Sequence, residues 1–144
     1  FISNNEKVLS FNQENIKSVK GSWSEKYLDD KELRDFYSKA RISLIPLKES
    51  SQPSGQSVAL QSMSMGVPVM ITQTEGFWDK TKFNNFENII FLESNESKRW
   101  IKIIEEIYFD YDRLKEISKN AKITVEEEYN LDSFKDKLFV ILDL

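Results

Sequence analysis

The sequence of 144 residues contains no cysteine and no histidine. The absence of cysteine excludes disulfides and thiol chemistry, and it is compatible with a reducing compartment. The absence of histidine removes the commonest general base and the commonest metal ligand, and with no cysteine either we expect no transition-metal site. No apolar run approaches the ~18 residues that a membrane-spanning helix needs, so no span is predicted.

The charge balance is mildly acidic. Asp and Glu outnumber Lys and Arg by 24 to 20, and the net charge is −4. This argues against nucleic acid as the main partner, because binding to a phosphate backbone needs clustered Lys and Arg. Apolar residues make up 40% of the chain and include ten Phe, which is enough for a substantial core.

The length suits one domain, and we predict that residues 1–144 form a single domain. The chain opens on Phe1 rather than Met, so we expect it to be a fragment of a longer, two-domain protein whose N-terminal part is missing.

Strand and helix patterns alternate along the chain. We expect strands at 7–11, 16–20, 42–47, 67–72 and 88–92, and helices from Asp29 or Asp30 to about 40, at 55–65, from Ser94 or Asn95 to about 109, at 112–129 and from 132. The central strands are continuous apolar runs, which is typical of a parallel sheet covered on both faces. We therefore predict an α/β fold: a Rossmann-like, doubly wound, mostly parallel sheet of about five strands that closes with C-terminal helices.

Several local features have structural interpretations. The aromatic loop 73–88 is expected to pack on the domain and to hold a turn of helix at 78–83. Asp110-Tyr111-Asp112 is best explained as a helix stop followed by a new N-cap rather than as a metal motif. The apolar residues that we expect to face inward from the first two C-terminal helices are Trp100, Ile104, Ile107, Tyr108, Leu114, Ile117, Ala121 and Val125. The last helix is amphipathic and carries Phe134, Leu138 and Ile141.

Residues 54–69, SGQSVALQSMSMGVPV, form the segment that best predicts a binding site. A helix that begins just past the carboxyl end of strand 42–47 points its free N–H groups and the positive end of its dipole at whatever lies there. Such a helix start can bind a phosphate, and ligands of open α/β sheets bind beyond the carboxyl ends of the strands. The segment predicts a nucleotide or nucleotide-sugar site.

The candidate residues lie on the first two turns of this helix. Gly55 permits a tight turn and a close approach of a ligand to the backbone. Gln61 follows Ser57 by four residues, so it lies on the same face and its amide can reach back toward the same ligand. The alternative is that Ser54 or Ser57 only caps the helix, as any βαβ unit requires. The full candidate set is Ser54, Gly55, Gln56, Ser57, Val58 and Gln61.

This segment resembles the donor-binding segment of retaining GT-B glycosyltransferases of the large family four, in which a loop and a helix with a Glu lead into Ala-Met-Ala-x-Gly-x-Pro-Val. Residues 32–46, ELRDFYSKARISLIP, resemble the helix and strand that precede that loop in the family. Residues 72–79, TQTEGFWD, resemble its glycine-containing loop, and Tyr108–Phe134 resemble its closing helices. The resemblance covers roughly residues 15–140.

The resemblance implies half of a GT-B fold that binds a nucleoside diphosphate sugar through the backbone amides of Gly55–Val58. The family's ribose-binding Glu aligns with Gln61, which keeps hydrogen-bonding capacity without the charge. The family's second acid falls on Pro53. Glu49, in the same loop, is a candidate substitute, with a solvated loop charge as the alternative. Trp23 is a candidate for stacking on the base, with a half-buried structural aromatic as the alternative.

The resemblance further implies a transferase of glycan biosynthesis that moves a hexosyl unit to an acceptor with retention, without a cofactor or metal. The expected partners are the sugar nucleotide, the missing N-terminal acceptor-binding domain and, for the full-length protein, the surface of a membrane. The expected location is the cytoplasm or the cytoplasmic face of that membrane. We do not expect the fragment to catalyse alone. Two alternatives stay open: a GT-B-type sugar-nucleotide epimerase domain, and a non-catalytic module in which Pro53 and Gln61 mark a decayed donor site.

Overall fold

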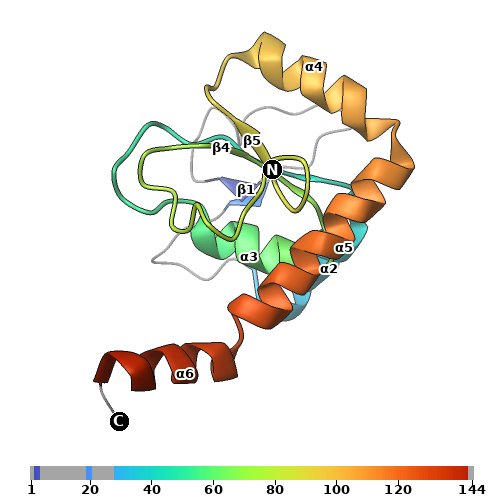
Figure 1. Cartoon of the computed structure of the whole chain (residues 1–144). Helices are drawn as coiled ribbons and strands as arrows, with labels where there is room; N and C mark the ends of the chain where they lie inside the picture. The colour runs from blue at the N-terminus through green and yellow to red at the C-terminus, as the bar shows by residue number, and fades with distance from the viewer. Residues whose placement is uncertain (1, 4–18, 21–27, 143–144) are drawn as a thin grey trace. The chain divides into compact units, whose positions relative to one another are not determined.

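The computed structural model describes residues 2–3, 19–20 and 28–142, and the chain forms two compact units, Phe1–Phe36 and Tyr37–Leu144, which we treat separately. The described elements are β1 (Ile2–Ser3), β2 (Val19–Lys20), α2 (Asp30–Lys39), β3 (Ser43–Ile45), α3 (Gln56–Ser64), β4 (Val69–Thr72), β5 (Ile90–Leu92), α4 (Ser97–Tyr108), α5 (Tyr111–Glu128) and α6 (Leu131–Leu142) (Figure 1).

In the first unit, β1 and β2 pair in parallel, with Ile2 opposite Val19. The strand expected at 7–11 lies outside the described residues, as does most of the one expected at 16–20. Asp29 begins α2 as predicted. Its carboxylate accepts from the Glu32 N–H at 2.7 Å, and the Glu32 carboxylate accepts from the Asp29 N–H at 2.9 Å. This reciprocal pair is a capping box.

The second unit contains a three-stranded parallel sheet in the order β3-β4-β5. The prediction of a parallel α/β sheet is confirmed, whereas the prediction of one sheet of about five strands is wrong for the described residues. There, β1 and β2 pair with each other in a separate sheet. Sequence patterns locate strands but do not state which strands pair, because pairing depends on contacts that are distant in the sequence.

Helices cover both faces of this sheet (Figure 1). Alternate side chains of β4 point to opposite faces, as in any strand. Val69 and Ile71 pack with Met63 of α3 and Ala121 of α5 on one face. The core of the other face contains Met70, Ile90, Leu92, Trp100, Ile107, Leu114 and Ile117, which come from the sheet, α4 and the first half of α5.

The expectation that each central strand is covered on both sides holds for β4 but not for β3. All four residues of β4 are buried. In β3, Ile45 is buried while Leu44 is 45% exposed. β3 and β5 are the two edge strands of this sheet, yet only β3 has an exposed apolar residue. The apolar run of β3 therefore did not show that one of its faces is open.

Helix α3 ends at Gly66, as predicted. Gly66 has φ 72°, its N–H donates to the Met63 carbonyl at 2.9 Å, and the Val67 N–H donates to the Ser62 carbonyl at 3.0 Å. These two bonds form a Schellman motif, which requires a left-handed residue that glycine adopts at low cost.

Other helix boundaries test the sequence interpretation. The predicted N-cap is confirmed: Asp110 is the N-cap of α5, and its carboxylate accepts from the Arg113 N–H at 3.1 Å. The helix α4 begins instead at Glu96 without a side-chain cap, so the prediction of Ser94 or Asn95 as its N-cap is wrong. The expected turn of helix at 78–83 is absent too; these residues form turns.

The inward faces predicted for α4 and α5 are largely confirmed. In α4, Trp100 and Ile107 are buried and Ile104 is partly buried. In α5, all four residues that were predicted to face inward are buried. The prediction is wrong for Tyr108, which is 39% exposed; the Arg41 guanidinium lies 4.4 Å from the centre of its ring.

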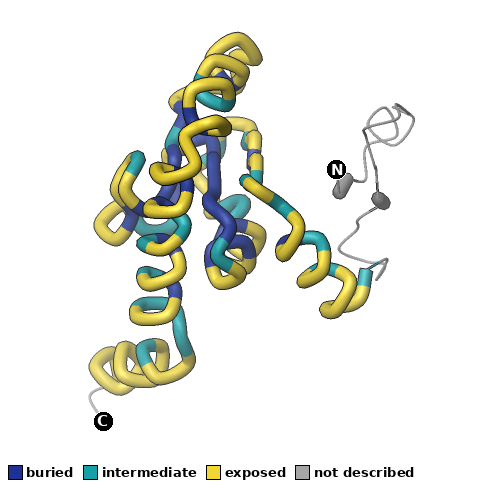
Figure 2. The backbone as a smooth tube through the Cα atoms, turned by 90° about the vertical axis from the view of Figure 1, so that its right-hand side faces the viewer, coloured by how far each residue is buried: buried dark blue, intermediate teal, exposed yellow. Residues whose placement is uncertain are grey.

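Helix α6 has no buried residue, and all of its residues except the partly buried Ser133 are exposed (Figure 2). Its apolar residues Phe134, Leu138 and Ile141 are 62%, 38% and 77% exposed. The last five residues of α6 are all apolar, and successive residues of a helix point 100° apart, so one neighbouring surface cannot cover all of them. No described helix is both long enough and apolar enough to cross a membrane.

Candidate functional site

The candidate site begins at Gly55, where the chain turns from the loop after β3 into α3. Gly55 is the N-cap of α3 and has left-handed backbone angles, φ 72° and ψ −2°. It is tightly enclosed on its inner side. A Cβ placed there would lie 3.1 Å from Ile45 Cγ2 and 3.3 Å from both Ile71 Cδ1 and Leu47 Cδ1. Both backbone conformation and packing therefore require glycine at this turn.

The start of α3 is electrostatically positive. The N–H groups of Gln56, Ser57 and Val58 precede the first intrahelical bond, in which the Ala59 N–H donates to the Gly55 carbonyl at 2.9 Å. Among the described residues no side chain caps this end, and the first turn contains no acidic residue. The alternative interpretation, in which the side chain of Ser54 or Ser57 only caps the helix, is therefore wrong. Ser57 and Val58 are exposed, while Ser54, Gly55 and Gln56 are partly buried.

Gln61 lies one turn further along the exposed face of α3, as its spacing from Ser57 predicted. Its neighbour Tyr37, at the end of α2, was not identified from the sequence. The Tyr37 hydroxyl shares its one proton between two long hydrogen bonds, to the Val58 carbonyl at 3.4 Å and to Gln61 Oε1 at 3.5 Å. Burial raises the pKa of Tyr37, so the hydroxyl stays protonated. This contact engages the amide oxygen of Gln61 and leaves its NH₂ group to act as a donor.

A closed set of hydrogen bonds joins the carboxyl ends of the strands beside this turn. The Thr72 hydroxyl accepts from the Leu47 N–H at 3.0 Å and donates to Asn95 Oδ1 at 2.5 Å. The Asn95 amide then donates to the Leu47 carbonyl at 2.6 Å. The expected N-cap Asn95 thus holds the loop after β3 instead. Sequence reasoning missed Thr72, since nothing in the local pattern marks its distant partners.

The two further candidates have different outcomes. Glu49 is exposed, and its Oε1 accepts from the Glu75 N–H at 2.8 Å and from the Ser50 N–H at 3.3 Å. This carboxylate joins the loop after β3 to the turn after β4. Trp23 lies outside the described residues, so its role in base stacking stays a prediction.

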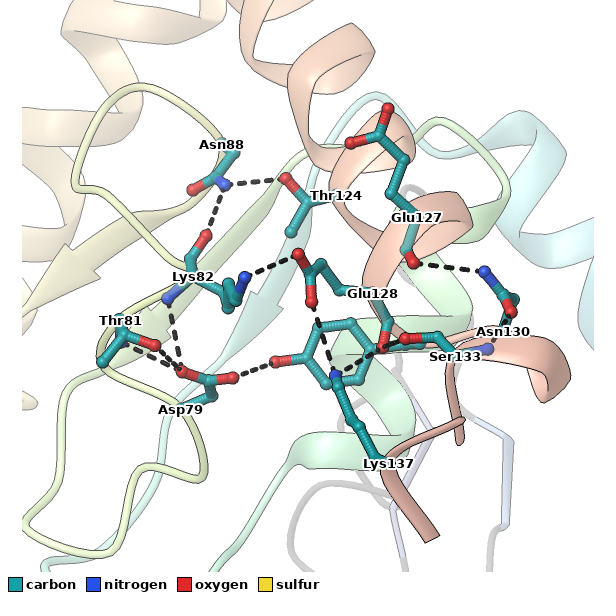
Figure 3. A network of polar contacts seen from close by, with 11 residues as sticks. Asp79, Thr81, Lys82, Asn88, Thr124, Glu127, Glu128, Asn130, Ser133 and Lys137 are labelled. Atoms are coloured by element: carbon teal, nitrogen blue, oxygen red, sulfur yellow. Dashed lines mark hydrogen bonds and ion pairs between the residues drawn. The ribbon is translucent and has the colours of Figure 1, made fainter. Parts of the chain in front are cut away.

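The aromatic loop that follows this turn packs on the domain, as predicted. Phe77 and Phe83 are buried, and their rings meet edge to face with centroids 5.6 Å apart. Beneath them, the Tyr129 hydroxyl donates to Asp79 Oδ2 at 2.9 Å, and Asp79 Oδ1 accepts from the Thr81 N–H at 3.0 Å (Figure 3).

The contacts of Asp79 and Tyr129 shift the pKa values of both side chains. Burial on its own would raise the pKa of Asp79, but the hydrogen bonds from Thr81, Tyr129 and Lys82 outweigh it and lower that pKa. Burial, reinforced by the bond to Asp79, raises the pKa of Tyr129. Nearby, Lys82 and Lys137 lie 2.6 Å and 3.4 Å from the two carboxylate oxygens of Glu128 (Figure 3). Asp79 and Lys82 thereby anchor the loop to the C-terminal end of α5, at Glu128 and Tyr129, and Lys137 of α6 binds the same Glu128.

Comparison with known proteins identifies a related fold. No protein-family model and no curated protein matches the sequence. The structure is similar to the crystal structure of Anabaena Alr3699/HepE in complex with UDP-glucose, with a TM-score of 0.68 and 14% sequence identity. The match covers 91% of this chain and 33% of that one, so this chain spans about a third of that protein's length. The similarity shows a shared α/β fold.

Proposed function

We propose that this chain is the donor-binding domain of a GT-B glycosyltransferase and that it binds a nucleoside diphosphate sugar at the start of α3. The full-length protein would transfer the hexosyl unit to an acceptor bound by another domain. We expect the reaction to need no cofactor or metal, and we expect a cytoplasmic location. The chain alone would bind the donor without turning it over.

The observation that carries the proposal is the uncapped, uncharged start of α3 behind the left-handed Gly55. It lies where β3 ends, in a fold shared with a protein that was crystallised with UDP-glucose. Backbone N–H groups at a helix start bind phosphate well, because their partial positive charge is fixed in place before the ligand arrives.

The chemistry follows from the groups present. The N–H groups of Gln56, Ser57 and Val58 would donate to diphosphate oxygens, and the Ser57 hydroxyl would add one more donor. The NH₂ group of Gln61 would donate to a ribose hydroxyl. During transfer, negative charge builds up on the departing diphosphate, and the same amides would stabilise that charge.

The test is a titration of the ¹⁵N-labelled chain with UDP, GDP and ADP, followed by NMR and calorimetry. We expect one of them to shift the amide signals of residues 54–61 selectively. Ser57→Asp provides the sharpest variant. A carboxylate about 4 Å from a phosphate charge repels it by roughly 4 kcal/mol at an effective dielectric constant of ~20, so binding should weaken by more than about a hundredfold.

Ser57→Asp should not harm the fold. Ser57 is exposed, and an acidic residue in the first turn stabilises a helix by about 0.3–1 kcal/mol. Ser57→Asn is the matched control, because it has nearly the same size as Asp without the charge, and it should bind within a few-fold of wild type. Equal affinity of the Asp and Asn variants would exclude the helix start as the phosphate site.

A non-catalytic module is the second candidate function. It is favoured by Pro53 and Gln61, which occupy the two positions where the resemblance implies acids. The same titration separates the two functions. A decayed site predicts no shift at residues 54–61 with any of the nucleotides at millimolar concentration, whereas the donor-binding function predicts saturation.

A further inference from the structure

The loop of residues 48–53, which leads from β3 to the start of α3, is held in part by the side chain of Glu49. Glu49 Oε1 accepts from two backbone N–H groups, that of Glu75 at 2.8 Å and that of Ser50 at 3.3 Å. Glu75 belongs to the turn after β4, 26 residues further along the chain. One carboxylate oxygen therefore joins this loop to the turn after β4, which also lies at the carboxyl ends of the strands.

The two loops lie in direct backbone contact at this point. The Gly76 N–H donates to the Ser50 carbonyl at 2.9 Å. A Cβ at Gly76 would lie 2.5 Å from the Gln52 carbonyl oxygen and from the Ser51 carbonyl carbon, which no side chain can tolerate. The Gln52 N–H also donates to the Ser50 hydroxyl at 3.0 Å, so the loop is fixed at consecutive residues.

This arrangement determines how the chain enters α3. The loop ends at Gly55, so its path sets the direction in which the N–H groups of Gln56, Ser57 and Val58 point. A binding site made of backbone amides depends on such supporting contacts, because it has no long side chain that could adjust to the ligand.

We propose that Glu49 is a positioning residue: it holds the loop of residues 48–53 against the turn after β4 and thereby sets the diphosphate-binding amides of α3, without touching the sugar nucleotide. The inference rests on the proposed function. It assigns Glu49 a role other than replacing the family's missing acid. It also requires only an acceptor oxygen, and not a negative charge, at this position.

The experiment compares UDP and UDP-glucose binding by wild type, Glu49→Ala, Glu49→Gln and Glu75→Ala. Glu49→Ala removes the acceptor, and we expect both ligands to bind about tenfold more weakly, which corresponds to about 1.4 kcal/mol for the lost charged hydrogen bonds. Glu49→Gln retains an oxygen that can accept from the same N–H groups and should restore most of the affinity. Glu75→Ala is the matched control, because it removes an exposed carboxylate of the same charge while keeping the N–H.

A second readout needs no ligand. In Glu49→Ala the amide NMR signals of residues 55–58 should shift or broaden, while those of Glu49→Gln and Glu75→Ala should stay close to wild type. Thermal unfolding of each variant checks that the fold is retained.

The outcomes are distinct. Weaker binding of UDP-glucose but not of UDP in both Glu49 variants would mean that the side chain contacts the sugar, and the positioning role would be overturned. Wild-type affinity and unchanged signals at residues 55–58 in Glu49→Ala would overturn it as well, while the proposed function would stand. If wild type binds neither ligand, the proposed function fails, and the positioning of a donor site fails with it.

Discussion

Two glycines at opposite ends of α3 allow the packing at the candidate site to be measured separately from backbone strain. Gly55 and Gly66 both have φ 72°. They differ in their surroundings. A Cβ at Gly66 would meet only Ser118 Oγ, at 3.6 Å, which is an ordinary contact. A Cβ at Gly55 would meet three core side chains, Ile45, Ile71 and Leu47, at 3.1–3.3 Å.

The expected losses follow from these contacts. A left-handed conformation costs a residue with a Cβ roughly 1–2 kcal/mol, and the stiffer unfolded chain returns about 0.4–1 kcal/mol of that when Gly becomes Ala. We therefore expect Gly66→Ala to lower the free energy of unfolding by about 1 kcal/mol. Gly55→Ala adds overpacking of about 1–2 kcal/mol, since three side chains must each give way, and the total is about 2–3 kcal/mol.

Urea unfolding, followed by tryptophan fluorescence and by far-ultraviolet circular dichroism, measures both variants. In a thermal scan, each kcal/mol should lower the Tm by about 2–4 °C for a chain of this length. Equal losses, or a larger loss for Gly66→Ala, would refute the tight packing around Gly55. The expected loss at Gly55 is also the reason why Ser57 rather than Gly55 is the better position for a binding test.

Two further predictions concern the helical part of the second unit. Asp110→Ala removes the N-cap of α5 and should lower the free energy of unfolding in urea by about 1 kcal/mol. Asp112→Ala, in the first turn of the same helix, should lower it by less than about half of that. A larger loss for Asp112→Ala than for Asp110→Ala would contradict the capping role of Asp110. For the pair of Asp79 and Tyr129, the pKa of the carboxyl is lowered, so its stabilisation is present above about pH 4 and is lost as the pH falls further. The pKa of the phenol is raised, so its stabilisation is present below about pH 10 and is lost as the pH rises beyond that. Tyr129→Phe should lower the free energy of unfolding by about 1 kcal/mol at neutral pH. It should also reduce the loss of stability above about pH 10, and an unchanged loss there would show that the phenol does not contribute.

The features that could be predicted from the sequence are those that depend on neighbouring residues. The Schellman end of α3 at Gly66, the capping box at Asp29 and the cap at Asp110 each involve residues within five positions of one another. The start of α3 belongs to the same class. Its glycine, its lack of charge and its place after an apolar strand are all visible locally, and the structure has each of them.

The features that could not be predicted depend on distant partners. Thr72 meets Asn95 across 23 residues, and Glu49 meets Glu75 across 26. Local patterns assigned Asn95 to a helix cap and left Glu49 between two roles, because a side chain that can cap a helix can equally hold a distant backbone group. The exposed side of β3 and the surface position of Tyr108 have the same origin, since apolar periodicity does not say which faces another element covers.

The same division between local and distant contacts explains why Glu49 matters for the proposed site, in which Pro53 and Gln61 occupy the two positions where the resemblance implies acids. A site that binds its ligand with carboxylates depends on the placement of a few side chains. A site that binds with backbone amides depends on the path of the chain, which is fixed by contacts outside the site itself. In this protein the contact of Glu49 with the Glu75 N–H and the close approach of Gly76 to residues 51 and 52 fix that path. Under the proposed function, the one acid of this loop therefore supports the amides of α3, and the turn after β4 contributes to the donor site without contacting the ligand.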